Sequence, residues 1–101
     1  MIVVNGRLQS TPENVAALKH ALAAMETASR AEDGCDDYTF SAEINDPGVI
    51  RITEKWRDLD ALAAHFRSPH MAEFQKAMRE HPPTSSAVTF FEATEVAPPR
   101  P

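Results

Sequence analysis

The segment between Tyr38 and Trp56 limits the fold of this chain more tightly than any other. From Tyr38 to Ile44, apolar and polar residues alternate, which is typical of a strand with one buried face. Residues 45–48 read Asn-Asp-Pro-Gly, which favours a turn, and a second apolar run extends from Val49 to Trp56. The sequence therefore predicts a β-hairpin whose two strands pair directly.

On the second strand of this hairpin, a carboxylate shares a face with apolar side chains. Glu54 lies two positions from both Ile52 and Trp56, so the alternation of a strand puts the three on one side. Burying a lone carboxylate in such surroundings is very costly. We therefore expect Glu54 to pair with His65 or an arginine, or to lie beside a wet pocket.

Helices and further strands are expected on both sides of the hairpin. Before it, the apolar run at residues 2–8 predicts a strand, and a helix is expected from near Pro12 to Gly34. After it, Asp58 predicts one helix cap and Ser68, followed by a proline, predicts another. The remaining boundaries are a helix stop at residues 81–83, a strand over Ala87–Val96 and a proline-rich tail over residues 97–101.

The resulting order is strand, helix, strand, strand, helix pair, strand, which is the ferredoxin-like βαββαβ arrangement of the α+β class. Right-handed crossovers put residues 2–8 and 49–56 in the centre of an antiparallel four-stranded sheet, with every helix on one face. The strands carry apolar side chains on both faces, so we expect the open face to meet the same face of a second copy. Residues 1–96 then form a single domain that assembles as a homodimer.

The charge and composition exclude several classes of partner. A net charge of −5 and a pI near 5.2 argue against binding nucleic acid, which needs clustered lysine and arginine. No run approaches the ~18 apolar residues of a membrane span. Residues 1–4 are too short for the apolar core of an export signal, so the expected location is the cytoplasm. Cys35 is the only cysteine, and no internal disulfide is expected.

Four segments of the chain resemble one known family. They are Glu32-Asp33-Gly34-Cys35 followed by Tyr38, then Glu54-Lys55-Trp56, then Ala64-His65, and finally Ser68-Pro69-His70-Met71. Together they resemble the antibiotic biosynthesis monooxygenase (ABM) domain, and most closely its small bacterial quinol monooxygenases. The resemblance extends to about Val96 and implies a dimeric α+β barrel. In that barrel two ferredoxin-like sheets pack face to face, and each protomer holds a pocket between its sheet and its helices.

The family contains several chemistries, so the resemblance does not by itself choose a reaction. Similar sequences include cofactor-independent quinol or anthrone monooxygenases, haem-degrading enzymes and isomerases of small signalling sugars. Haem-degrading relatives use an asparagine, a tryptophan and a histidine. In register, Asn5 matches the first, but His65 stands at the tryptophan position and Gln75 at the histidine position. The haem ligand is therefore missing, and the resemblance argues against haem degradation.

Cofactor and metal motifs are absent from the sequence. With only three glycines there is no glycine-rich phosphate loop, so flavin and nicotinamide cofactors are not expected. The histidines stand at positions 20, 65, 70 and 81, and no two have the i, i+4 spacing of a helical metal site. Only a tertiary arrangement that the sequence does not predict could assemble such a site. We therefore expect neither a cofactor nor a metal ion.

The chemistry that remains is oxygenation without a cofactor, in which a quinol loses a proton and its anion reduces O₂ directly. Such a site has to exclude water, supply a base and stabilise an oxyanion. His65, next to core position Phe66 on its helix, is the candidate base, oriented by Glu54. The alternative is that His65 only ties helix to strand through a hydrogen bond. Asn5 is the candidate oxyanion donor, although a strand-end or bulge role is equally open.

Aromatic and apolar side chains are candidates for the wall of a substrate pocket. They are Tyr38, Trp56, Phe66, Met71, Phe74 and Phe90. Each can equally be part of the core, and Trp56 in particular can anchor the core or an interface. The expected substrates are O₂ and a small aromatic quinol or phenol. Two alternatives stay open: an isomerase or other proton-transfer enzyme acting on a small carbonyl compound, and a ligand-binding stress-response protein without turnover.

Overall fold

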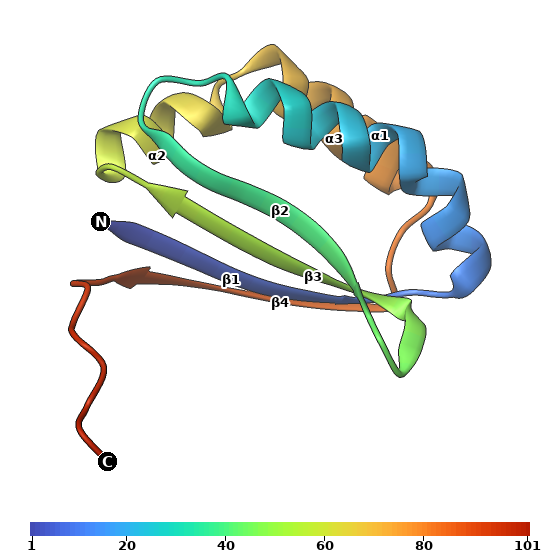
Figure 1. The fold of residues 1–101 in the computed structure, drawn as a ribbon. Helices are drawn as coiled ribbons and strands as arrows, with labels where there is room; N and C mark the ends of the chain where they lie inside the picture. Colours follow the sequence, from blue (N-terminus) through green and yellow to red (C-terminus); the bar gives the residue numbers. More distant parts are fainter.

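The fold is a single antiparallel sheet with all of its helices on one face (Figure 1). The computed structural model describes residues 1–101. Its elements are β1 (Ile2–Gln9), α1 (Pro12–Arg30), β2 (Cys35–Glu43), β3 (Asp46–Trp56), α2 (Leu59–Phe66), α3 (Pro69–Glu80) and β4 (Ser85–Glu92). The four strands are ordered β2-β3-β1-β4. The predicted ferredoxin-like arrangement, with β1 and β3 in the centre, is therefore confirmed.

Each helix begins at a side chain that caps it. Thr11 Oγ1 accepts a hydrogen bond from the backbone N–H of Asn14 at 3.1 Å, and Asp58 Oδ1 accepts one from Ala61 at 2.9 Å. Ser68 Oγ accepts the corresponding bond at the start of α3. These caps satisfy backbone donors that have no partner inside the helix, and they explain why the three starting points are readable from sequence.

The first helix ends earlier than Gly34. It stops at Arg30, and residues 31–34 form a turn that leads into β2. Gly34 has a φ of +83°, and a Cβ at this position would lie only 2.7 Å from the Cβ of Ala61. The glycine thus belongs to the tight entrance into β2 rather than to the end of the helix. The turn moves Glu32 away from α1 and towards α2.

Several strand ends also differ from expectation. β2 begins at Cys35 rather than Tyr38, and β3 begins at Asp46, inside the predicted turn of residues 45–48, so that the turn itself is residues 44–45. β2 stops at Glu43, and Ile44 is 99% exposed in the hairpin turn. The last strand is Ser85–Glu92 rather than Ala87–Val96, because its only partner is β1 and the final pair is Ile2 with Glu92. Beyond that pair the ladder has no partner strand. The residues that follow extend away from the sheet (Figure 1).

The core lies between the sheet and the helices. One buried cluster includes Val4, Met25 and Trp56, and a second includes Leu8 and Leu22. The helices pack over β2 and β3, and all of β4 is exposed at the uncovered edge. None of the helices is long and apolar enough to cross a membrane.

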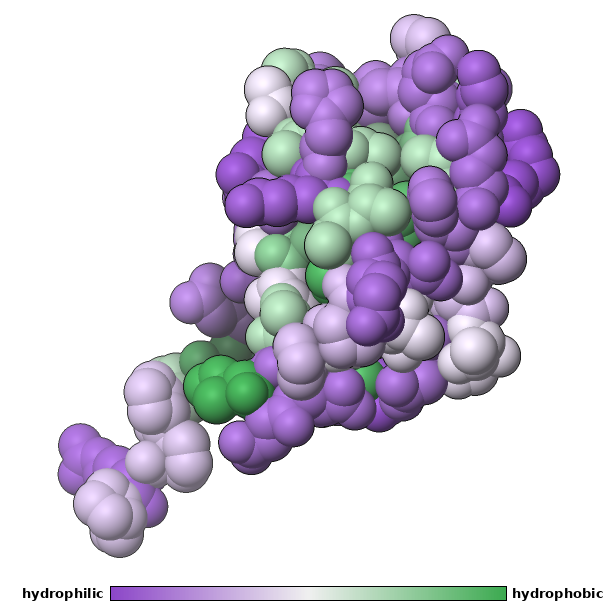
Figure 2. Space-filling model, turned by 90° about the vertical axis from the view of Figure 1, so that its right-hand side faces the viewer, coloured by the Kyte–Doolittle hydropathy of each residue, from purple (hydrophilic) through white to green (hydrophobic).

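The surface at one end of the two layers is largely hydrophilic. Figure 2 looks at this end and shows weakly hydrophobic residues along its middle, framed by hydrophilic ones. Such a surface is typical of a solvated face rather than of a large interface.

Candidate functional site

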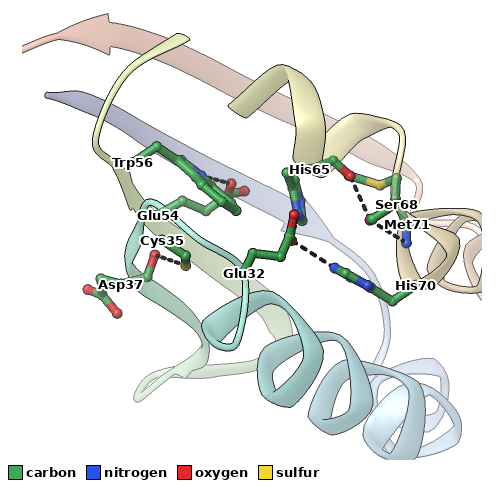
Figure 3. A network of polar contacts seen from close by, with 9 residues as sticks. All are labelled: Glu32, Cys35, Asp37, Glu54, Trp56, His65, Ser68, His70 and Met71. Carbon is green, nitrogen blue, oxygen red and sulfur yellow. Dashed lines mark hydrogen bonds and ion pairs between the residues drawn. The ribbon is translucent and has the colours of Figure 1, made fainter. Parts of the chain in front are cut away.

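Glu32 brings two histidines together at one end of the helix layer. Its Oε2 atom lies 2.6 Å from His65 Nδ1 and 2.8 Å from His70 Nε2. Figure 3 shows the carboxylate between the two imidazole rings. The three residues come from the turn after α1, the end of α2 and the first turn of α3. A single carboxylate oxygen therefore joins three separate segments of the chain.

The break between α2 and α3 fixes the two histidines relative to each other. Ser68 Oγ donates to the backbone carbonyl of His65 at 2.6 Å and accepts from the N–H of Met71 at 3.2 Å. Pro69 then begins α3. This side-chain bridge lets the chain change direction between the helices while both histidines point to the same carboxylate.

His65 is the most enclosed member of the cluster. Its side chain is 1% exposed, and its ring centroid lies 4.6 Å from that of Trp56 and 5.3 Å from that of Tyr38. Its Nε2 atom is buried and has no hydrogen-bond partner. When Nδ1 of a neutral imidazole donates its N–H to a carboxylate, Nε2 carries the lone pair. Buried polar atoms without a partner are uncommon, so His65 Nε2 is a candidate reacting atom.

Glu54 lies near this cluster but does not bond to His65. It is 8% exposed, which confirms its predicted place among apolar neighbours. Its Oε1 atom accepts a hydrogen bond from Trp56 Nε1 at 2.8 Å. The predicted hydrogen bond between Glu54 and His65 is therefore wrong, because the indole two positions along the same strand face takes the carboxylate and Glu32 takes the imidazole.

The interior around these carboxylates is electronegative. Burial raises the pKa of Glu54, its hydrogen bond from Trp56 and the nearby His65 lower it, and the charge of Glu32 raises it. Burial, followed by the charges of Glu32 and Glu54, also raises the pKa of Cys35 to about 11. No lysine or arginine lies within ion-pair distance of Glu32 or Glu54. The histidines are thus the only side chains available to balance Glu32.

The structure brings some predicted site residues together. Tyr38, Trp56 and Met71 belong to the buried cluster that surrounds His65. Burial, followed by the charge of Glu54, raises the pKa of Tyr38 well above its usual range. These side chains form a largely apolar wall beside the histidine and keep bulk water away from it.

Other predicted residues lie apart. Asn5 pairs in register with Thr53 and is exposed, whereas its neighbour Val4 is 1% exposed on the helix-covered face. Side chains alternate between the faces of a strand, so Asn5 lies on the sheet face opposite His65 within this chain. Phe74 packs on Phe40, with ring centroids 5.5 Å apart, and its partial burial places it between the two core clusters.

Phe66 and Phe90 form an exposed pair at the uncovered edge of the sheet. Their ring centroids are 6.2 Å apart, and each residue is about half exposed. The Phe66 ring is also 5.9 Å from the ring of His65. An aromatic row therefore leads from the surface at β4 to the buried histidine.

Glu32 is the site residue that the sequence did not predict. It was expected at the end of the first helix, and its partners are 33 and 38 positions away in the chain. His70, which contacts the same carboxylate, has a side chain that is only 21% exposed. The available signal was the segment Glu32-Asp33-Gly34-Cys35, whose glycine marks a turn.

Three hollows stand out on the surface. The first, about 480 Å³, lies between α1 and α3 and includes His70 in its lining together with His20, Met25 and Phe74. The second, about 410 Å³, lies between α1 and β2, and the third, about 320 Å³, lies near the N-terminus. His65 and Glu54 line none of the three. His70 is thus the member of the cluster that meets an open hollow.

The ferredoxin-like α+β fold, together with the contacts of Glu32 with His65 and His70, defines a class of protein: a small α+β protein with a candidate acid–base site. The sequence profile of the antibiotic biosynthesis monooxygenase family matches residues 1–77. The chain belongs to this family. The resemblance carried by the segments around Glu54 and His65 is therefore confirmed.

Similar proteins support this assignment. Rv0793 of Mycobacterium tuberculosis, provisionally named a monooxygenase, is 35% identical over 79 residues, which cover 78% of this chain and 77% of the relative. Its solved structure matches with a TM-score of 0.83 and 31% identity, over 96% of this chain and 98% of that one. A Deinococcus radiodurans structure, provisionally named an antibiotic biosynthesis monooxygenase, matches over 100% of both chains at 31% identity with a TM-score of 0.89. These likenesses agree with a general monooxygenase-like function.

Proposed function

We propose that the protein is a cofactor-independent monooxygenase of a small aromatic quinol or phenol, with His65 as the base. One observation carries this proposal. His65 Nδ1 lies 2.6 Å from the Glu32 carboxylate, while His65 Nε2 is buried without a partner. A carboxylate that holds one imidazole nitrogen orients the ring and leaves the other nitrogen free to take a proton.

The chemistry requires no group beyond the substrate, O₂ and this base. Nε2 takes the phenolic proton, and the Glu32 carboxylate stabilises the imidazolium that results. The phenolate then reduces O₂, and one oxygen atom bonds to a ring carbon while the other leaves as water. The new oxygen is a carbonyl when a phenol becomes a quinone and a hydroxyl group when a hydroquinone becomes a hydroxyquinone. For a hydroquinone that becomes a hydroxyquinone, the substrate itself supplies all four electrons, so the step balances without an added reductant.

The surroundings of His65 suit a charged intermediate that water would quench. Trp56 and Tyr38 pack against the imidazole and are 0% and 3% exposed. A water-poor site strengthens the interaction between the imidazolium and Glu32. We place the substrate entrance at the Phe66–Phe90 pair, whose rings are the exposed end of the aromatic row. Because His65 is 1% exposed, the substrate reaches it only when these rings move apart.

A homodimer formed through the open sheet face is part of this proposal. The helices occupy one face only, and Phe91, which pairs with Val3, is 49% exposed. Asn5 lies on the same open face, so it would contact the second copy rather than His65 of its own chain. Action in the cytoplasm also belongs to the proposal.

The test is oxygen uptake by metal-free protein with a panel of hydroquinones and phenols. We expect one O₂ per quinol and a loss of rate of at least ~100-fold in His65→Gln, because a positioned base contributes about that much. His81→Gln removes a histidine at the end of α3, outside the site, and is the matched control. Circular dichroism checks that each variant folds. An unchanged rate in a folded His65→Gln protein contradicts the proposed base.

The same assay separates the two alternative functions. A proton-transfer isomerase needs the same base but no oxygen, so it would convert a small aldose under argon without O₂ uptake. A ligand-binding protein would bind a quinol without converting it. The monooxygenase proposal fails if either of these results is obtained in place of O₂ uptake.

A further inference from the structure

Three potential metal ligands converge on one point between the turn after α1 and the α2–α3 break. His65 Nδ1, His70 Nε2 and a carboxylate oxygen of Glu32 all lie within 4.8 Å of one another. From this geometry we propose that the cluster binds one divalent transition-metal ion, such as Zn²⁺, Co²⁺ or Fe²⁺. Two imidazoles and one carboxylate are a ligand set that these borderline ions favour, and it leaves coordination positions open.

Small movements convert the hydrogen-bonded cluster into a coordination site. Ligands about 2.0–2.2 Å from a metal ion are roughly 2.9–3.4 Å from each other. The separations of 2.6 Å and 2.8 Å from Glu32 Oε2 to the two ring nitrogens therefore have to open by a few tenths of an ångström. The two ring nitrogens, which lie within 4.8 Å of each other, have to come to within the same roughly 2.9–3.4 Å. His70 provides this freedom, because its side chain is 21% exposed and lies in the first turn of α3. His65 stays fixed in the core.

The local charge favours a cation. Glu32 and Glu54 are close enough for the charge of Glu32 to raise the pKa of Glu54, and neither has a lysine or arginine partner. A divalent ion at Glu32 supplies the positive charge that the side chains of this region lack. An ion can also reach the site without crossing the core, because His70 lines the hollow between α1 and α3.

Metal binding changes which nitrogen of His65 carries the proton. Coordination through Nδ1 needs the lone pair on that atom, so the N–H of the neutral ring moves to Nε2. His70, coordinating through Nε2, correspondingly carries its N–H on Nδ1. His65 Nε2 thereby becomes a hydrogen-bond donor. A bound ion and a basic Nε2 are therefore mutually exclusive states of the same cluster.

The experiment titrates metal-free, full-length protein with Co²⁺ and follows its visible d–d absorption. We expect one Co²⁺ per chain in the wild type and a loss of affinity of at least ~10-fold in Glu32→Gln and in His70→Asn. His70 and Glu32 are chosen because they are partly exposed, whereas a change at the buried His65 risks unfolding. His20→Asn removes a histidine from the same hollow but outside the cluster, and it should bind Co²⁺ like the wild type.

A second measurement on the same samples is thermal unfolding. An ion that binds only the folded chain raises the melting temperature as its concentration rises, and this shift should vanish in His70→Asn. The proposal is overturned if Co²⁺ binds the wild type no more tightly than it binds His70→Asn, or if His20→Asn loses binding to the same extent.

The metal site and the proposed monooxygenase can fail independently. Oxygen uptake by metal-free protein, together with stoichiometric Co²⁺ binding that suppresses it, supports both. Oxygen uptake without Co²⁺ binding overturns the metal site and leaves the base intact. Co²⁺ binding by a protein that consumes no O₂ when metal-free supports the metal site and contradicts the cofactor-independent reaction.

Discussion

At the scale of single residues, Glu32 decides what His65 can do. Its carboxylate holds Nδ1 of that ring and Nε2 of His70, so one side chain sets the tautomers of both imidazoles. Without it, His65 would be a buried imidazole with no partner on either nitrogen, which is unfavourable by about 1–3 kcal/mol per unpaired group. The burial of His65 and its candidate role as a base therefore depend on the same atom, Glu32 Oε2.

A prediction at this scale concerns the buried carboxylate of Glu54. Its pKa is raised, chiefly by burial, so the folded chain holds this proton at pH values where the unfolded chain has lost it. The contribution of Glu54 to the free energy of unfolding therefore falls as pH rises from the unfolded pKa of about 4.5 through the folded value. Glu54→Gln cannot ionise and keeps an oxygen for Trp56 Nε1. The variant should gain stability relative to the wild type across this interval.

Urea unfolding of metal-free protein between about pH 4 and pH 8 measures this difference. Glu95→Gln, which changes an exposed carboxylate beyond β4, is the matched control and should show no comparable trend. A stability difference between Glu54→Gln and wild type that stays constant, or decreases, with rising pH contradicts the assignment of burial as the main cause.

At the scale of elements, the turn between α1 and β2 delivers Glu32 to the histidines. Its geometry depends on Gly34, which has a φ of +83° and faces the Cβ of Ala61 on α2. Ser68 fixes the geometry of the α2–α3 break, because its hydroxyl group donates to the carbonyl of His65 and accepts from the N–H of Met71. Two short connections, rather than the regular helices and strands, thus assemble the site.

Replacing Gly34 with alanine tests the first of these connections. The added methyl group would lie 2.7 Å from the Cβ of Ala61, and the positive φ is strained for a residue with a side chain. We therefore expect the free energy of unfolding to fall by about 1–3 kcal/mol. Asp36→Ala, an exposed change in the same segment, should stay within about 0.5 kcal/mol of the wild type. Chemical denaturation measures both. Equal stability of the two variants would show that the turn tolerates a side chain.

At the scale of the whole molecule, one face of the sheet has no helix on it. One layer of helices covers one side of the sheet, and β4 is exposed along its length (Figure 1). Phe91 of β4 pairs with Val3, so it lies on this face, and it is a large apolar residue that is 49% exposed. Exposed apolar groups of this kind usually mark a binding surface.

Sedimentation equilibrium tests the dimer through one residue of that face. The wild type should have twice the chain mass of 11.1 kDa at micromolar concentration. Phe91→Glu puts a charge into the open face and should shift the equilibrium to the monomer, because an unpaired buried charge is costly at an interface. Ile44→Glu, at the 99% exposed hairpin tip, should stay dimeric. A monomeric wild type contradicts the dimer directly.

The order of elements follows from the sequence because it rests on local physics. Strand alternation, the turn after β2 and the caps at Thr11, Asp58 and Ser68 act over a few residues, so they can be read without knowing the fold. The buried position of Glu54 followed from the same alternation. The end of β4 could not be predicted in this way, because a strand ends where its partner strand ends, and the partner of β4 is β1.

The site itself was decided by the tertiary structure. Alternation shows which residues share a strand face but not which face the helices cover, so it could not separate Asn5 from His65. Nor could any local pattern pair Glu32 with histidines 33 and 38 positions away. The sequence determined that a histidine and a carboxylate lie in the core of a ferredoxin-like fold. The pairing of His65 with Glu32 depends on tertiary packing, because it joins the turn after α1 to the end of α2, which are far apart in the sequence.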